Sequence, residues 1–130
     1  MKLLLDTHTF LWLVVGSPNL SAAAQAALAD PANELYLSVA SVWELAIKTS
    51  RPKPQLTLTD PLDVYIAKWT AIYQLNVLSV ELPHALHVVG LPDHHRDPFD
   101  RVLMAQALVE GMTLVSGDGK FATYPVTILW

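Results

Sequence analysis

The chain has 130 residues, and 8 Lys and Arg against 12 Asp and Glu give it a formal net charge of −4 at pH 7. Apolar residues make up 52% of it and charged residues 15%, well below the roughly 25% charged residues of an average soluble domain. So much apolar surface excludes intrinsic disorder, and so few charges suggest that a partner covers part of the surface. The length predicts a single domain over residues 1–130.

Membrane insertion, secretion and thiol chemistry are not expected. The longest apolar stretch, residues 10–15, has six residues, whereas a membrane-spanning helix needs ~20. The opening apolar residues resemble a secretion signal, but Asp6 and His8 interrupt them. The sequence has no Cys, which excludes disulfides, thiolate metal sites and cysteine nucleophiles. We therefore expect a cytoplasmic protein, in which any nucleic-acid contact is local and bridged by metal because the net charge is negative.

Short apolar runs alternate with helical segments along the chain, which is typical of an α/β domain with a mainly parallel sheet. The runs predict strands at residues 3–5, 35–39, 77–80, 113–116 and 126–129. The segments between them predict helices at residues 9–15, 21–28, 83–89 and 98–110, and two more that begin at Ser41 and at Asp60-Pro61. In the helix after Asp60-Pro61, the spacing predicts a buried face made of Val64, Ala67, Trp69 and Ile72.

Two acidic residues directly follow predicted strands. Asp6 follows the first strand, and Asp118 follows the fourth. In an open parallel sheet, ligands bind beyond the carboxyl ends of the strands, so both carboxylates lie where chemistry is expected. Each also has an ordinary structural explanation, because Asp6 can cap the next helix and Asp118-Gly119 is typical of a turn.

Three further carboxylates lie at the starts of predicted helices. Glu44 ends an S-x-x-E motif that begins at Ser41 and has the form of a capping box, although a carboxylate there can also face the cleft. Asp97 followed by Pro98 is a usual helix start. Asp100 falls in the first turn of that helix, where the helix dipole stabilises an anion by ~0.3–1 kcal/mol.

Taken together, the carboxylates predict a metal site. The fold rules bring the ends of the first and fourth strands and the starts of two helices to one edge of the sheet. Carboxylates gathered there repel one another, which raises their pKa values unless a cation neutralises them. The expected ion is Mg²⁺, with Mn²⁺ as its substitute, because both are hard ions that take oxygen ligands. Such an ion can polarise a phosphodiester and lower the pKa of a bound water molecule.

Four sequence blocks, in their order and spacing, resemble the PIN-domain family and most closely its VapC-type toxins of bacterial toxin–antitoxin modules. The blocks are Leu3-Leu4-Leu5-Asp6-Thr7-His8, Ser41-x-x-Glu44, Arg96-Asp97-Pro98-Phe99-Asp100-Arg101 and Leu114-Val115-Ser116-Gly117-Asp118-x-x-Phe121. The resemblance covers essentially the whole chain. Where many members of the family have Thr before the last Asp, this chain has Ser116, whose hydroxyl can make the same hydrogen bond.

This resemblance implies an α/β/α sandwich with a five-stranded, mainly parallel central sheet. It also implies a Mg²⁺- or Mn²⁺-dependent endoribonuclease, a homodimer inhibited by a cognate antitoxin whose tail occupies the active-site groove. By position, the acidic residues of the family correspond to Asp6, Glu44, Asp100 and Asp118. We expect Asp6, Asp100 and Asp118 to bind metal and Glu44 to orient a water molecule for RNA hydrolysis. The residues expected to support the metal or to contact substrate are Asp97, Ser116, Arg96 and Arg101.

Other side chains near these blocks have less specific roles. The candidates for contacts with RNA phosphates are Lys48, Arg51, Lys53, Arg96, Arg101 and Lys120, and an internal salt bridge is the alternative for Arg101. The pair His94-His95 favours capping, packing or substrate contact over metal binding, because a soft-ligand site needs more His or Cys nearby. The tryptophans expected in the core are Trp12, Trp43 and Trp69, while Trp130 suits a core or an interface.

Two alternative functions stay open. A phosphatase of the haloacid-dehalogenase type also begins with a strand followed by Asp, but that class has Asp-x-Asp where this chain has Asp6-Thr7-His8. A non-catalytic PIN-like module that only binds a partner protein has no need to keep four acidic residues. Their retention favours the nuclease.

Overall fold

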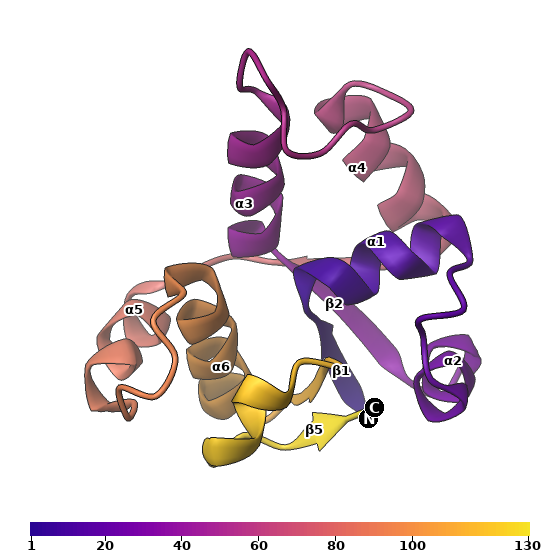
Figure 1. Cartoon of the computed structure of the whole chain (residues 1–130). Coiled ribbons are helices and arrows are strands. Elements are labelled where there is room, and N and C mark those ends of the chain that lie inside the picture. Colours follow the sequence, from indigo (N-terminus) through magenta and orange to yellow (C-terminus); the bar gives the residue numbers. More distant parts are fainter.

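Five strands form one parallel sheet in the computed structural model, which describes residues 1–130 (Figure 1). The strands are β1 (Lys2–Leu5), β2 (Glu34–Ser38), β3 (Asn76–Leu78), β4 (Thr113–Val115) and β5 (Ile128–Leu129). They lie in the order β3-β2-β1-β4-β5, and every adjacent pair is parallel. The five-stranded parallel sheet expected from the sequence is confirmed.

Helices cover both faces of this sheet and complete a three-layer α/β/α sandwich. They are α1 (Thr7–Val15), α2 (Ala22–Ala29), α3 (Val39–Thr49), α4 (Leu62–Ile72), α5 (Leu82–His87) and α6 (Pro98–Glu110), with 3-10 turns η1 (Val88–Gly90) and η2 (Gly119–Thr123). Side chains alternate between the faces of a strand, so Leu3 and Leu5 pack with α1 to α4 while Leu4 packs with α6 and the C-terminal segment. None of the helices has the length and apolarity needed to cross a membrane.

The strand register brings three chain segments to one edge of the sheet. Leu5 of β1 pairs with Leu37 of β2 on one side and with Val115 of β4 on the other. Asp6 and Ser116, the next residues after β1 and β4, therefore leave the sheet together at its carboxyl edge. This is the edge at which parallel sheets bind ligands, and at which the sequence predicts the metal site.

Helix α6 has the ends that the sequence predicts. The side chain of Asp97 accepts hydrogen bonds from the backbone N–H groups of Phe99 and Asp100, and Pro98 is the first helical residue. Gly111 ends the helix with φ 65°, a left-handed conformation that favours glycine. Asp100 is thereby fixed in the first turn.

Helix α3 begins earlier than expected, and the predicted capping box at its start is absent. Val39, predicted as a strand residue, is its first residue, because Ser38 at the end of β2 already caps it by accepting the N–H of Ala40 at 3.0 Å. Ser41 is a buried residue within the helix rather than its cap. Glu44 consequently lies in the second turn, and capping does not account for it.

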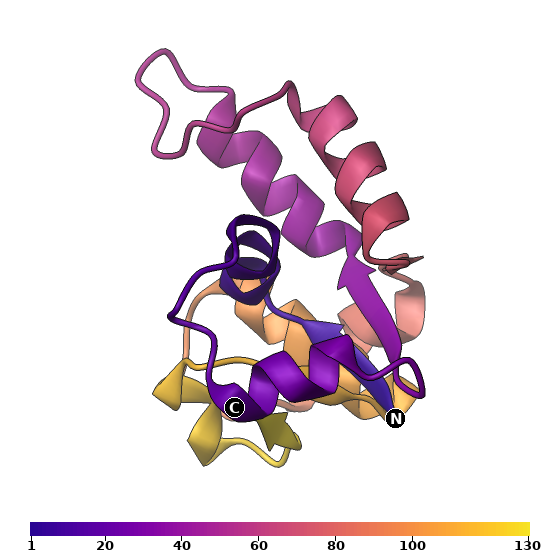
Figure 2. The same ribbon diagram turned by 90° about the vertical axis from the view of Figure 1, so that its right-hand side faces the viewer.

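The buried face of α4 differs from the predicted one. Val64 and Ile72 are 48% and 56% exposed, and Ala67 is exposed as well. The residue that α4 buries is Tyr65, whose ring lies 6.3 Å from that of the half-buried Trp69. Aromatic rings bury more area than aliphatic side chains, so the face of α4 that carries Tyr65 and Trp69 is the one that packs against the core. Figure 2 shows α3 and α4 extending together away from the sheet, joined by the loop between them.

Tryptophans lie nearer the surface than expected. Trp43 is 63% exposed and packs edge-on against Phe99, so its predicted place in the core is wrong. Trp12 and Trp130 pack against each other with ring centroids 5.8 Å apart. Trp130 also covers Gly117, where an added Cβ would lie 2.6 Å from the indole ring. A side chain at position 117 would therefore have to displace the indole ring of Trp130.

Candidate functional site

Asp6 is a buried carboxylate that joins β1 to α1 and to β4. Its side chain is 6% exposed. Oδ1 accepts a hydrogen bond from the backbone N–H of Thr9 at 2.7 Å, which caps α1, and Oδ2 accepts one from the hydroxyl of Ser116 at 2.5 Å. The same Ser116 hydroxyl oxygen accepts the backbone N–H of Asp118 at 3.1 Å. Ser116 thus links the two acidic residues that follow β1 and β4.

Glu44 reaches the same region from α3. It is 7% exposed, and its Oε1 accepts a hydrogen bond of 2.7 Å from the hydroxyl of Thr7, the residue that follows Asp6. Its Oε2 lies 2.7 Å from the ammonium group of Lys48, one helical turn further on. A buried carboxylate is costly unless it is hydrogen-bonded and paired, and Glu44 has both kinds of partner.

A polar cleft of about 570 Å³ opens at this edge of the sheet. Ten residues line it, none of them apolar: His8, Glu44, Lys48, His94, His95, Arg96, Asp97, Asp100, Asp118 and Lys120. Three of the four predicted acidic site residues are among them. Asp6 does not line the cleft, but it adjoins the wall through Thr7 to Glu44 and through Ser116 to Asp118.

The carboxyl group of Asp100 has a perturbed pKa. Burial raises this pKa to about 6, and repulsion from Asp97 and Glu44 adds to the rise, while a hydrogen bond with His95 opposes it. The ionised form of Asp100 is therefore disfavoured at this partly buried position. A bound cation would favour the ionised form of Asp100, as expected when carboxylates converge.

Three side chains are close enough to hold one cation. His95, Asp100 and Asp118 each offer a ligand atom, and these atoms all lie within 4.8 Å of one another. The two carboxylates are hard oxygen ligands that suit Mn²⁺ and, with added water molecules, Mg²⁺, while His95 contacts one of them, Asp100. The residues present thus fit a divalent ion of the predicted kind.

His95 is the site residue that the sequence reasoning missed. Its side chain is buried, and its Nε2 lies 2.6 Å from Oδ2 of Asp100. The scarcity of His and Cys nearby favours capping, packing or substrate contact for this residue, whereas its partner in the structure is the carboxylate of Asp100. The signal was available in the sequence as a histidine five residues before Asp100.

The remaining predicted residues divide into two groups. Asp97 and Arg96 line the cleft, and Asp97 also caps α6. Arg101 does not line it and makes no salt bridge, so that alternative is wrong. Its guanidinium group donates instead to backbone carbonyl oxygens of the preceding loop, those of Val88, Leu91, Pro92 and His95.

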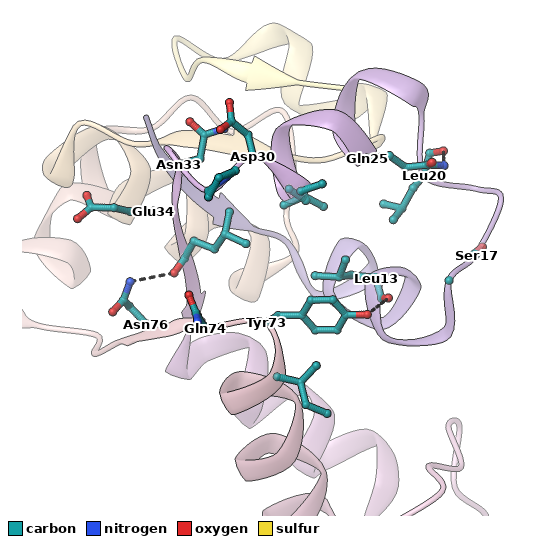
Figure 3. Close-up of a pocket in the computed structure, with 16 residues that line it drawn as sticks. Leu13, Ser17, Leu20, Gln25, Asp30, Asn33, Glu34, Tyr73, Gln74 and Asn76 are labelled. Atoms are coloured by element: carbon teal, nitrogen blue, oxygen red, sulfur yellow. Dashed lines mark hydrogen bonds between the residues drawn. The ribbon is translucent and has the colours of Figure 1, made fainter.

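A larger cavity of about 700 Å³ lies at the opposite edge of the sheet, beside the amino ends of β2 and β3 (Figure 3). Its polar side chains include Asp30, Glu34 and Asn76, and the amide of Asn76 donates to the backbone carbonyl of Leu35. The one group of potential metal ligands in the chain is not here but in the polar cleft. The polar cleft is therefore the candidate active site.

The fold and the acidic cleft define a class of protein. A family model described as the PIN domain matches residues 3–126. The chain therefore belongs to the PIN-domain family, which confirms the resemblance found in the sequence.

Individual relatives agree with this assignment. The chain is 30% identical over 132 aligned residues to Ribonuclease VapC22 of Mycobacterium tuberculosis, with 96% of each chain covered. Its structure is similar to VapBC2 from Rickettsia felis bound to a DNA fragment from its promoter, with a TM-score of 0.70 at 17% identity over 98% of this chain and 97% of that one. DNA-bound VapBC from Salmonella typhimurium gives a TM-score of 0.65 at 18% identity, covering 98% and 96% of the two chains. At such identities these two structures support the fold.

Proposed function

We propose that this chain is a metal-dependent endoribonuclease and the toxin of a toxin–antitoxin pair, acting in the cytoplasm as one domain over residues 1–130. Membership of the PIN-domain family and the relative named a ribonuclease support the reaction class. The observation that carries the proposal is the polar cleft, which Glu44, Asp100 and Asp118 line beside the buried Asp6.

The cation of this proposal is Mg²⁺, with Mn²⁺ as a substitute. Asp100 and Asp118 would hold it, and Asp6 would do so directly or through water. When bound, it would polarise a phosphodiester and lower the pKa of a water molecule. No thiol is present and no side-chain nucleophile is needed for hydrolysis of this kind.

The other cleft residues orient the attacking water molecule and bind the RNA. Glu44, fixed by Thr7 and Lys48, accepts a proton or a hydrogen bond from the attacking water. Arg96 and Lys120 line the cleft with their positive charges, which suits contacts with RNA phosphates. Their positive charge is local, which suits a protein whose net charge is −4.

An antitoxin partner is supported by a second, apolar groove that continues the cleft. This groove of about 620 Å³ runs along α1 and α4 and is lined by residues such as Leu11, Trp12 and Trp69. It shares His8 and Lys48 with the polar cleft. A protein segment that fills the groove could therefore extend its tail into the cleft. The solved relatives named above are VapBC assemblies.

Homodimerisation is supported by an exposed apolar surface. A hollow of about 260 Å³ without polar lining is formed by Val39, Ala40, Trp43, Val80, Pro98, Phe99 and Val102. Trp43 is 63% exposed at its rim. An exposed aromatic residue on such a patch is typical of a protein interface, and a second copy of this chain is the partner that we propose.

Cleavage of single-stranded RNA tests the proposal directly. The wild type should cleave with added Mg²⁺ and stop with EDTA, Asp6→Asn should be inactive, and Asp63→Asn, an exposed residue of α4, should behave as the wild type. Equal activity of wild type and Asp6→Asn, or activity unaffected by EDTA, would contradict it. If the chain were instead a non-catalytic PIN-like module that only binds a partner protein, it would give no cleavage and no carboxylate-dependent metal binding by calorimetry. The family assignment removes the haloacid-dehalogenase alternative.

A further inference from the structure

His95 is a buried histidine whose ring contacts the carboxylate of Asp100. Its side chain is 8% exposed, and its Nε2 lies 2.6 Å from Oδ2 of Asp100. The ring also packs edge-on against Phe121, with centroids 5.9 Å apart and planes at 81°. An ionised Asp100 can only accept a hydrogen bond, so Nε2 carries the proton and donates it. Two contacts therefore fix the plane of the imidazole ring and the direction of its donor.

The loop that carries His95 is fixed by the hydroxyl of Tyr124. This buried hydroxyl accepts the backbone N–H groups of His94 at 3.0 Å and His95 at 2.7 Å, and it donates to the carbonyl oxygen of Pro92 at 2.8 Å. One side-chain oxygen thus satisfies three backbone groups within four consecutive residues. Buried backbone groups are costly when unpaired, so the loop conformation depends on Tyr124.

Arg101 fixes the same loop from α6. Its guanidinium group reaches four carbonyl oxygens between Val88 and His95, at 2.8–3.3 Å. Arg101 directly follows Asp100 in the first turns of α6, so one helix carries the carboxylate and also anchors the loop that contacts it. Because the guanidinium group of Arg101 donates to backbone carbonyl oxygens, it is not available to bind RNA phosphate.

We propose that His95 is a positioning residue for Asp100, held in place by Tyr124 and Arg101. The Nε2–H group fixes Oδ2 of the carboxylate, so that Asp100 would be oriented to hold a cation together with Asp118. This inference rests on the proposed function, because it assigns His95 a role at the same metal site. Hydrogen-bond partners of metal ligands typically contribute 10–100-fold to metal affinity, and His95 is such a partner.

Binding of Mn²⁺ to the full chain without RNA, measured by calorimetry, tests this role separately from catalysis. His95→Leu removes the donor and should weaken binding by about 10–100-fold. His95→Gln keeps an N–H donor of similar reach and should retain most of the affinity. His87→Gln, at an exposed histidine of α5 that does not line the cleft, should change nothing. Thermal unfolding of each variant identifies any loss of folded protein.

Substitutions of tyrosine test whether the conformation of the loop at residues 92–95 matters for metal binding, without changing a residue that lines the cleft. Tyr124→Phe should weaken Mn²⁺ binding, although less than His95→Leu does. The matched control is Tyr73→Phe, which removes a hydroxyl bonded to the carbonyl oxygen of Leu13 far from the cleft, and which should leave binding unchanged.

The outcomes separate the two proposals. Wild-type affinity in His95→Leu would overturn the positioning role while the proposed function stands. An equal loss in His95→Gln and His95→Leu would also overturn it, because the imidazole would then be a metal ligand itself. Absence of Mn²⁺ binding by the wild type would overturn the proposed function, and the inference with it.

Discussion

The hydroxyl of Ser116 donates a hydrogen bond of 2.5 Å to the carboxylate of Asp6, which lies 110 positions earlier in the chain. Because this bond joins the ends of two adjacent parallel strands, the geometry of the sheet directly sets the geometry of the acidic cluster. Serine is small enough for this buried place, and its oxygen also accepts the N–H of Asp118.

Removing this hydroxyl should impair the site more than the fold. In Ser116→Ala, the buried Asp6 loses one of its two donors, so we expect a loss of about 1–3 kcal/mol in the free energy of unfolding and about 10–100-fold in cleavage rate. Ser116→Thr keeps the hydroxyl and should retain activity. Ser50→Ala, which removes an exposed serine hydroxyl at the end of α3, serves as the control. Full activity of Ser116→Ala would contradict this role.

Neutralising Asp100 should stabilise the metal-free protein while abolishing activity. Its pKa is raised from 3.8 to about 6, so the group favours folding below its unfolded pKa and loses that contribution as the pH rises through 6. The ionised form is therefore unfavourable at pH 7.5. With a discount for partial exposure, Asp100→Asn should raise the unfolding free energy by about 1 kcal/mol.

Thermal unfolding in EDTA between pH 5 and 8 measures this effect. The gain of Asp100→Asn over the wild type should be largest above pH 7 and shrink as the pH falls through 6. The exposed Asp93→Asn should show no such trend. An Asp100→Asn variant that is less stable than the wild type at pH 7.5 would refute the unfavourable charge.

The raised pKa also makes cation binding pH-dependent. A carboxyl group must lose its proton to bind a metal, so Mn²⁺ affinity should rise between pH 5 and 7 and level off above that range. Calorimetry at pH 6 in two buffers of different ionisation enthalpy should detect proton release on binding. Affinity that is constant from pH 5 to 7 would be inconsistent with the perturbed Asp100.

Much of this architecture could be predicted from local sequence patterns. The run Leu3-Leu4-Leu5 specified a strand buried on both faces, and Asp97-Pro98 with Gly111 specified both ends of α6. These predictions succeeded because the determining residues are neighbours in the chain. The acidic residues of the site could be predicted where they directly follow a strand, as Asp6 does, or lie at the start of a helix, as Asp100 does.

Features that depend on contacts between distant segments could not be predicted this way. The predicted start of α3 at Ser41 is too late, because nothing local distinguishes Ser38 from Ser41 as a cap. The exposure of Trp43 depends on what α3 packs against, which its own periodicity does not reveal. The role of His95 requires the loop and the first turn of α6 to meet, and Tyr124 arranges this from the far end of the chain.

Basic residues of the cleft should contribute to RNA binding, and those of the loop after α3 should not. Arg96→Ala and Lys120→Ala should each weaken binding of a single-stranded RNA and lower the slope of log affinity against log salt by about 0.7. Lys53→Ala, an exposed loop residue that does not line the cleft, is the control. Fluorescence anisotropy with a catalytically inactive Asp118→Asn background measures both quantities, and identical slopes for all variants would contradict the assignment.

The apolar patch around Trp43 should control oligomeric state. Trp43→Glu places a charge in a surface without polar lining, which should convert the proposed dimer to a monomer at micromolar concentration. Val64→Glu changes an equally apolar exposed residue on α4 and should leave the dimer intact. Light scattering coupled to gel filtration gives the masses. A wild type that is monomeric at high concentration, or a Trp43→Glu variant that is still dimeric, would contradict the interface.

Asp100 and Asp118 are proposed to hold one divalent cation in the polar cleft, with Glu44 beside it and Asp6 adjoining its wall. A crystal grown with Mn²⁺ and measured at the manganese absorption edge tests this proposal most directly. We predict an anomalous peak in the polar cleft within bonding distance of Asp100 and Asp118, and no peak there in crystals of Asp118→Asn. A peak only elsewhere on the molecule, or none at saturating Mn²⁺, would contradict the account.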